Sequence, residues 1–214
     1  MTQKIGILGS GGVAQTLAGG FLKHGYPVQL GTRSPDKLKE FQQNYPDAKV
    51  SSFSDVAAWA EIIVLAVKGS AAISALDLAG KATLAGKIVI DPTNPIADAP
   101  PQNGVLQFFS SINRSLMEDL QAACPQARFV KAWSMIGGPH MVNPEFPSRP
   151  TMFLCGNDAE ARKTVSAILS QFGFDPEDMG MAEAARAIEP LCMLWCIPGL
   201  TGNSWNHALR LIRK

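Results

Sequence analysis

Two glycines and an alanine near the N-terminus have the spacing that could hold the pyrophosphate of a dinucleotide. The pattern Gly9-x-Gly11-x-x-Ala14 follows an apolar run at 5–8 and opens a helical pattern that reaches Leu22. Gly9 would permit a tight turn, Gly11 would let a phosphate approach the backbone, and Ala14 would let helix and strand pack closely. The N–H groups facing the phosphate would come from four residues: Ser10, Gly11, Gly12 and Val13. The alternative is a glycine-rich turn that binds no ligand.

The end of the next apolar strand has the chemistry of a second phosphate site. Sites that prefer NAD usually place Asp or Glu there, on the ribose 2′-hydroxyl, whereas this chain has Gly31 followed by Thr32, Arg33 and Ser34. The Arg33 guanidinium can bind phosphate oxygens through two hydrogen bonds, and Thr32 or Ser34 can donate hydroxyl hydrogens. Lys37, in the following helix, adds positive charge. These residues favour NADP(H) over NAD(H). Alternatively, Arg33 is a solvated charge at the end of a strand.

Both candidate sites lie in a chain that alternates apolar strands with helical patterns. Strands are predicted at 5–8, 28–31, 50–52, 62–67, 87–91 and 128–133, and helices at 12–22, 35–44, 53–60, 70–78 and 112–123. Ser34 is predicted to cap the second of these helices. The alternation indicates an α/β fold with a doubly wound, parallel Rossmann sheet, whose ligands bind beyond the carboxyl ends of the strands. Those ends are at 9–13, 32–34, 67–69, 91–94 and 133–138.

We expect residues 1–138 to form the Rossmann NADP-binding domain and residues 139–214 a small C-terminal α/β extension ending in a helix. The extension has a predicted strand at 151–156 and a helix that Asn157 caps and that reaches Phe172. Residues 182–197 have helical composition, and Pro190 is expected to kink this helix. The segment becomes almost continuously apolar at 191–200, a run that Glu189 bounds and Pro198-Gly199 interrupts. The segment is too short to span a membrane, which favours a core helix or a dimer contact.

The composition narrows the classes of partner. With 214 residues, 46% of them apolar, the chain can bury a substantial core. Its 19 basic and 18 acidic residues give a formal net charge of +1, without the basic block that marks nucleic-acid or anionic-membrane binding. We therefore expect small-molecule partners. The N-terminus has no apolar segment typical of a signal peptide, so a cytoplasmic location is expected.

The cysteines and histidines give little indication of a metal site. The four cysteines, Cys124, Cys155, Cys192 and Cys196, are scattered along the chain, and the Cys192-x-x-x-Cys196 pair lies in a helical pattern without nearby His or carboxylate ligands. They are interpreted as reduced core thiols, and no metal is predicted. His140, in a glycine-rich loop, could transfer a proton if the substrate were a carbonyl or imine, and is otherwise a surface histidine.

Seven segments distributed over nearly the whole chain resemble coenzyme F420-dependent NADP reductases and their bacterial relatives. They are KIGILGSGGVAQTLA, GTRSPDK, IIVLAVKG, IVIDPTNP, FVKAWSMIG, FLCGND and RAIEPLCMLWCIPG. The resemblance implies an NADPH site on the Rossmann domain and hydride exchange with a deazaflavin stacked on the nicotinamide. It also implies a homodimer that uses the C-terminal helices. Because this hydride transfer is direct, no catalytic acid or base is predicted.

The same resemblance assigns residues to the parts of the cofactor. It places the pyrophosphate at Ser10, Gly11, Gly12 and Val13, and the 2′-phosphate at Thr32, Arg33 and Lys37. Val67, Lys68 and Asn94 would line the cofactor groove, and Trp133, Ser134, Met135 and Ile136 would border the nicotinamide. Lys68 could instead be a solvated charge, and Trp133 and Met135 could be core residues.

The second substrate stays open, because Ser134 stands where the archetypal F420 reductase has a histidine. The first hypothesis is an NADPH oxidoreductase that reduces F420, FMN or another flavin-like acceptor. A second is an imine or carbonyl reductase, which needs a proton donor such as His140 or Ser134. A third is a protein that senses NADPH without turnover.

Overall fold

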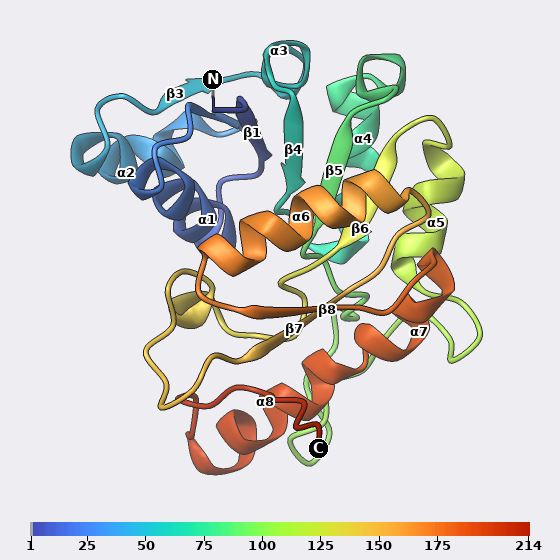
Figure 1. The fold of residues 1–214 in the computed structure, drawn as a ribbon. Coiled ribbons are helices and arrows are strands. Elements are labelled where there is room, and N and C mark those ends of the chain that lie inside the picture. The colour runs from blue at the N-terminus through green and yellow to red at the C-terminus, as the bar shows by residue number, and fades with distance from the viewer. Residues whose placement is uncertain (1) are drawn as a thin grey trace.

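The computed structural model describes residues 2–214, which form two parallel sheets (Figure 1). The large sheet has the strand order β3-β2-β1-β4-β5-β6. Its strands are β1 (Ile5–Leu8), β2 (Val28–Gly31), β3 (Lys49–Ser51), β4 (Ile62–Leu65), β5 (Ile88–Asp91) and β6 (Arg128–Lys131). In this order β1 lies between β2 and β4, with Ile5 opposite both Val28 and Ile62. The predicted doubly wound parallel Rossmann sheet is therefore confirmed.

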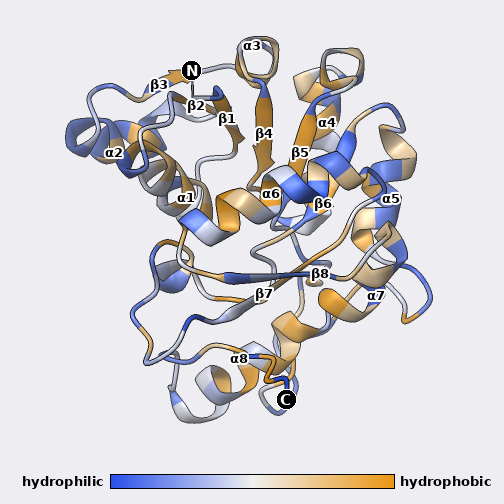
Figure 2. Cartoon of the chain, viewed as in Figure 1, coloured by the Kyte–Doolittle hydropathy of each residue, from blue (hydrophilic) through white to orange (hydrophobic). Residues whose placement is uncertain are grey.

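Helices cover both faces of the large sheet. The core on one face contains side chains from α1 (Gly12–Lys23), α2 (Lys39–Asn44) and α6 (Ala159–Gln171). The core on the other face contains side chains from α3 (Phe53–Trp59), α4 (Ala72–Ala79) and α5 (Leu116–Ala123). The central strands β1, β4 and β5 are apolar (Figure 2), apart from Asp91 at the end of β5, because both faces of a parallel sheet are buried there.

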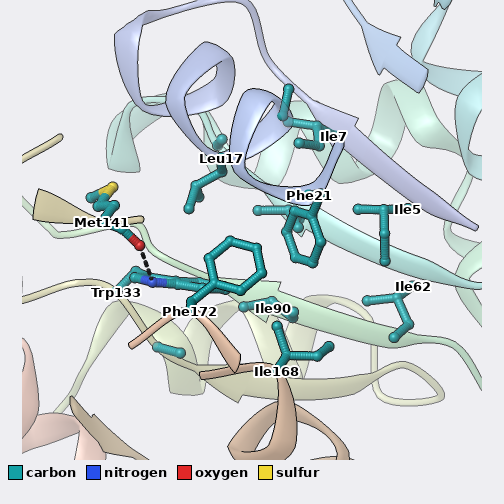
Figure 3. Packing of buried hydrophobic residues seen from close by; sticks show 14 of the residues in the cluster. Ile5, Ile7, Leu17, Phe21, Ile62, Ile90, Trp133, Met141, Ile168 and Phe172 are labelled. Carbon is teal, nitrogen blue, oxygen red and sulfur yellow. Dashed lines mark hydrogen bonds between the residues drawn. The ribbon is translucent and has the colours of Figure 1, made fainter. Parts of the chain in front are cut away.

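Aromatic packing joins the large sheet to the C-terminal part of the chain. Phe21, Trp133 and Phe172 meet in one cluster, and the Trp133 ring is fully buried (Figure 3). The Trp133 indole N–H donates to the carbonyl oxygen of Met141 at 3.1 Å. Trp133 and Met135 are therefore core residues, the alternative that competed with a place beside the nicotinamide.

A second, two-stranded sheet consists of β7 (Thr151–Leu154) and β8 (Asp175–Asp178), which run parallel. With the short α7 (Ala185–Ile188) and α8 (Leu191–Gly202), it lies below the large sheet in Figure 1. We did not predict β8, because its residues Asp-Pro-Glu-Asp lack apolar alternation. The boundary between 138 and 139 stays a prediction, since residues from both sides share the aromatic core.

Two predicted helix starts were wrong. The helix predicted from residue 112 begins at Leu116, where Ser115 accepts the Glu118 N–H and Glu118 accepts the Ser115 N–H. This capping box was present in the sequence and marks the start. The next helix is capped by Asp158, whose side chain accepts the Ala161 N–H at 2.7 Å. Asn157 instead accepts the Ala182 N–H at 3.1 Å.

The structure agrees only in part with the roles predicted for Ser34, Pro190 and Pro198. The Ser34 side chain does not cap a helix, and a 3-10 turn at Pro35–Leu38 precedes α2. Pro190 does separate α7 from α8, as predicted. Pro198, however, lies inside α8, which continues to Gly202 because later N–H groups still reach the Pro198 and Gly199 carbonyls. None of the helices in residues 2–214 combines the length and hydropathy needed to cross a membrane.

Candidate dinucleotide site

The glycine turn between β1 and α1 combines a structural glycine with two that face open space. Gly9 has a φ of +140°, and a Cβ there would collide with the carbonyl oxygen of Ala66 at the end of β4. A Cβ on Gly11 or Gly12 would meet none of the described atoms within 4 Å beyond the neighbouring residues and the backbone of α1. Gly9 therefore permits the close approach of β1 and β4, whereas the other two leave room for a ligand. Ala14 is fully buried against the turn, as predicted.

The N-terminus of α1 has the properties of an anion site. Gly11 is its N-cap, none of the described side chains caps the helix, and its first turn has no acidic residue. The first N–H groups of a helix have no partner within the helix, and the helix dipole makes this end positive. A phosphate placed there would accept these hydrogen bonds.

The segment after β2 presents positive charge to solvent. Arg33, Ser34 and Lys37 are exposed, and within the described chain neither Arg33 nor Lys37 has an ion-pair partner. The neighbouring carboxylate, Asp36, is paired with Lys39 at 2.6 Å. Thr32 is buried, and its hydroxyl oxygen accepts the Ser34 N–H at 3.0 Å. Within the described chain, two cations without ion-pair partners therefore lie beside the turn that follows β2.

Gln15 connects the two phosphate-facing segments, a role that we did not predict. Its side-chain amide donates to the carbonyl oxygen of Ser10 at 3.0 Å and to that of Lys37 at 3.4 Å. No sequence signal marks it, because an amide on a helix has many possible partners. It holds the glycine turn at a set distance from the cations after β2.

The ends of β4, β5 and β6 meet beside this turn. A Cβ on Gly69 would collide with the carbonyl oxygen of Asn94, and the Asn94 amide donates to the carbonyl oxygen of Ser134 at 2.6 Å. Val67 and Asn94 are half-buried at this edge. Lys68 is exposed and paired with Asp98 at 3.2 Å. The predicted groove residues therefore lie together, with Lys68 at the solvent side.

Ser134 and Ile136 follow β6 at the same edge but are buried. Their exposed fractions are 3% and 8%, and the Ser134 hydroxyl has no hydrogen-bond partner in the part of the chain that is described. Their side chains thus lie beneath the edge in this structure. Contact between them and a nicotinamide stays a prediction.

A buried ion triad, absent from our sequence analysis, lies under this edge. Lys131 Nζ is 2.6 Å from Asp91 Oδ2 and 3.0 Å from Glu189 Oε1, and all three side chains are at most 1% exposed. Burial alone would lower the pKa of Lys131, but the two carboxylates outweigh it and raise the pKa. Lys131 is therefore charged. The triad could not be predicted from the sequence, because Glu189, at the α7–α8 junction, is far along the chain from Asp91 and Lys131.

An aromatic cavity of about 550 Å³ opens beside the loop after β6. The residues that line it are Gly137, Gly138, Pro139, His140, Trp195, Trp205 and Asn206. The ring centroids of Trp195 and Trp205 are 5.6 Å apart, and the Trp195 ring packs so closely on Gly137 that a Cβ there would collide with it. Among these lining residues none is Lys, Arg, Asp or Glu. The cavity suits a flat, apolar ring system.

The strand order and the glycine turn at its switch point, between β1 and β4, define a Rossmann-type dinucleotide-binding protein. Residues 4–95 match the family model described as NADP oxidoreductase, coenzyme F420-dependent. The crystal structure of a candidate F420-dependent NADP reductase from Arthrobacter sp. FB24 superposes with a TM-score of 0.92 and is 31% identical. That alignment covers 99% of this chain and 100% of the other. The chain belongs to this family of NADP-dependent oxidoreductases, so the predicted resemblance is confirmed.

Two other proteins show how widely the same architecture is used. Metalloreductase STEAP3 from Rattus norvegicus is 33% identical over 205 residues, or 92% of this chain. The chain spans only 38% of the length of that relative. A reductive aminase from Aspergillus terreus, solved with NADPH and ethyl-5-oxohexanoate, has a TM-score of 0.69 at 17% identity, over 95% of this chain and 64% of the aminase. The aminase shares the fold.

Proposed function

We propose that this protein binds NADPH along the edge of the large sheet and transfers its hydride to a flavin-like acceptor, either a deazaflavin such as F420 or FMN. The pyrophosphate would lie on the N–H groups of Ser10 to Val13, and the 2′-phosphate on Arg33 and Lys37, with Thr32 and Ser34 beside it. The uncapped N-terminus of α1, with open space above Gly11, is the observation that carries this proposal.

The nicotinamide would then lie over the ends of β4, β5 and β6, near Val67 and Asn94. The aromatic cavity adjoins this edge through Gly137 and Gly138. Direct hydride transfer needs two rings held face to face in a site that excludes water, and needs no acid or base. Trp195 and Trp205 supply an apolar wall of that kind.

The test is NADPH oxidation by the purified protein with F420, with FMN or without acceptor, following the visible absorption of the acceptor. We expect NADPH loss that depends on one of these acceptors. Trp205→Ala should raise the acceptor KM without changing the NADPH Kd, and Trp205→Phe, which keeps an aromatic ring, should behave more like the wild type. Tight NADPH binding without transfer to any acceptor would favour the NADPH-sensing hypothesis.

A second function, imine or carbonyl reduction, is favoured by the position of His140. His140 is one of the residues that line the aromatic cavity, where its ring packs 5.0 Å from that of Phe146, and an imidazole there could protonate a small substrate bound in the cavity. His140→Gln should then lower the reduction rate of a cyclic imine by about 10²–10⁴-fold, the usual contribution of a general acid. An unchanged rate would remove His140 from the mechanism.

We further propose that α8 contributes to a homodimer. Leu194 and Leu200 on this helix are 54% and 39% exposed, although the helix is apolar along its whole length. Light scattering after gel filtration should give twice the chain mass, and Leu194→Asp should reduce it. Ile73→Asp, an equally apolar exposed position on α4, is the matched control.

A further inference from the structure

The buried triad connects three separate parts of the molecule. Lys131 lies at the end of β6, Asp91 at the end of β5, and Glu189 between α7 and α8. Glu189 also accepts the N–H groups of Leu116 and Met117, both at 3.0 Å, and so binds the N-terminus of α5. One charged centre thereby holds two strands and three helices.

One arm of the triad reaches the proposed nicotinamide edge. Lys131 Nζ donates to the carbonyl oxygen of Thr93 at 2.7 Å, while Asp91 accepts the Thr93 N–H and hydroxyl at 2.9 and 2.5 Å. Thr93 is therefore held at both its amide and its carbonyl group. The next residue, Asn94, donates to the Ser134 carbonyl and fixes the loop after β6 to the same edge.

The other arm reaches the aromatic cavity. Glu189 precedes Pro190, from which α8 starts, and Trp195 projects from that helix onto Gly137. The position of Glu189 thus sets where α8 begins and where the Trp195 ring lies. The Trp195 indole N–H donates to the carbonyl oxygen of His207 at 2.9 Å, which attaches the C-terminal segment to the same wall.

Stability alone does not account for a buried charge triad. Replacing such groups by apolar side chains of similar volume is often neutral or stabilising, because burying charges costs as much as their attraction returns. Hydride transfer is different, since a misplacement of about 1 Å between reacting groups can lower a rate about 100-fold. A buried triad that fixes the positions of both the nicotinamide edge and the acceptor cavity would therefore favour hydride transfer.

We propose that Lys131 is a positioning residue, which sets the distance between the nicotinamide edge and the acceptor cavity through Asp91 and Glu189. The inference rests on the proposed hydride transfer. Lys131 touches neither substrate in this arrangement. It acts through Thr93 and Asn94 on one side and through α8 on the other.

The decisive experiment measures binding and hydride transfer separately. Lys131→Met alone leaves two buried carboxylates without a cation, so we pair it with the neutral triple variant D91N/K131M/E189Q. A milder variant, Thr93→Val, removes only the hydroxyl bond to Asp91. Lys81→Met, which breaks the surface ion pair with Asp77 at 2.8 Å, is the control. For each, we measure the NADPH Kd and the single-turnover rate with 4-deuterated and unlabelled NADPH.

We expect the triple variant to lower the single-turnover rate about 10- to 100-fold, with an NADPH Kd within about threefold of wild type. Thr93→Val should give the same pattern at about 3- to 10-fold, and Lys81→Met should change neither quantity. Should the triple variant fail to fold, Thr93→Val decides alone. Unchanged transfer in a folded variant, or losses confined to the Kd, would overturn the positioning role. No transfer by the wild type would overturn the proposed function itself.

Discussion

The two halves of the candidate site are built in opposite ways. Around α1 and β2 the two cations that would meet a ligand, Arg33 and Lys37, are exposed and have no ion-pair partner within residues 2–214. Under the ends of β5 and β6 three charged groups, Asp91, Lys131 and Glu189, are buried and bound to one another. A binding surface thus keeps its donors free for a ligand, whereas a positioning centre must be complete without one.

The largest expected effect is that of replacing Gly11 by alanine, and the same substitution at Gly9 is the comparison. Gly11→Ala should weaken NADPH binding about 100-fold, equivalent to about 2.7 kcal/mol, because its Cβ fills the space proposed for the pyrophosphate. The melting temperature of this variant should stay close to that of the wild type, since none of the described atoms beyond its neighbours and the backbone of α1 lies within 4 Å of the added Cβ. Gly9→Ala should instead lower the melting temperature by several degrees, because it combines a positive φ with a collision. Similar thermal losses in both variants would erase the distinction between a structural and a ligand-facing glycine.

Arg33→Ala tests the exposed cations. A charge-assisted hydrogen bond contributes about 1.5–3 kcal/mol, so the NADPH Kd should rise about 10- to 100-fold while the NADH Kd hardly changes. Lys39→Ala, whose side chain is already paired with Asp36, is the control and should leave both unchanged. A fluorescence titration of both cofactors measures this. Equal losses for NADPH and NADH would mean that Arg33 does not contact a 2′-phosphate.

Gln15→Ala tests whether the Gln15 side chain fixes the glycine turn relative to the segment after β2. The variant loses the side-chain bonds to Ser10 and Lys37, so the two phosphate contacts are no longer set relative to each other. We expect the NADPH Kd to rise about 3- to 10-fold, the value of one net hydrogen bond. The same titration serves, with Gln121→Ala as a control at a glutamine on α5. An unchanged Kd would show that the turn keeps its geometry without this bridge.

The smallest effect concerns the helix that Glu189 binds. Arg186 donates two hydrogen bonds to Glu118 in the first turn of α5, and this contact lowers the Glu118 pKa from 4.5 to about 2. Because the folded-state pKa is depressed, the stabilisation is complete above pH 4.5 and is lost as the pH falls toward 2. Arg186→Gln should lower the melting temperature by about 2–4 °C at pH 7. Calorimetry should find this difference shrinking below pH 4.5; a constant difference would contradict the ion pair.

The exposed phosphate-facing half of the site could be predicted from the sequence, whereas the buried half could not. The phosphate-facing residues lie within one β1–α1–β2 unit, so Gly9, Gly11 and Arg33 stand at a fixed spacing and could be found from the pattern alone. The central strands β1, β4 and β5 were recognisable because both their faces are buried and their sequences are almost continuously apolar. Local signals carry this information.

The buried half depends on contacts between distant segments. Glu189 meets Lys131 only after the chain has folded back through β7, α6 and β8, and Trp205 reaches the cavity from the C-terminal segment. The polar strand β8 gains its place from pairing with β7. The local sequence around these residues does not indicate which distant segments they contact. Two signals were present in the sequence and missed: the capping box at the start of α5 and the Asp158 cap of α6.

The assignment of the sheet edge as an NADPH site is best tested by the dissociation constants of the wild-type protein for NADPH and NADH, measured by titration at one ionic strength. The exposed Arg33 and Lys37 beside an uncapped α1 predict that NADPH binds at least about tenfold more tightly, the effect of one charge-assisted contact. Equal affinities, or the absence of binding for both cofactors, would contradict the assignment of this edge as an NADPH site.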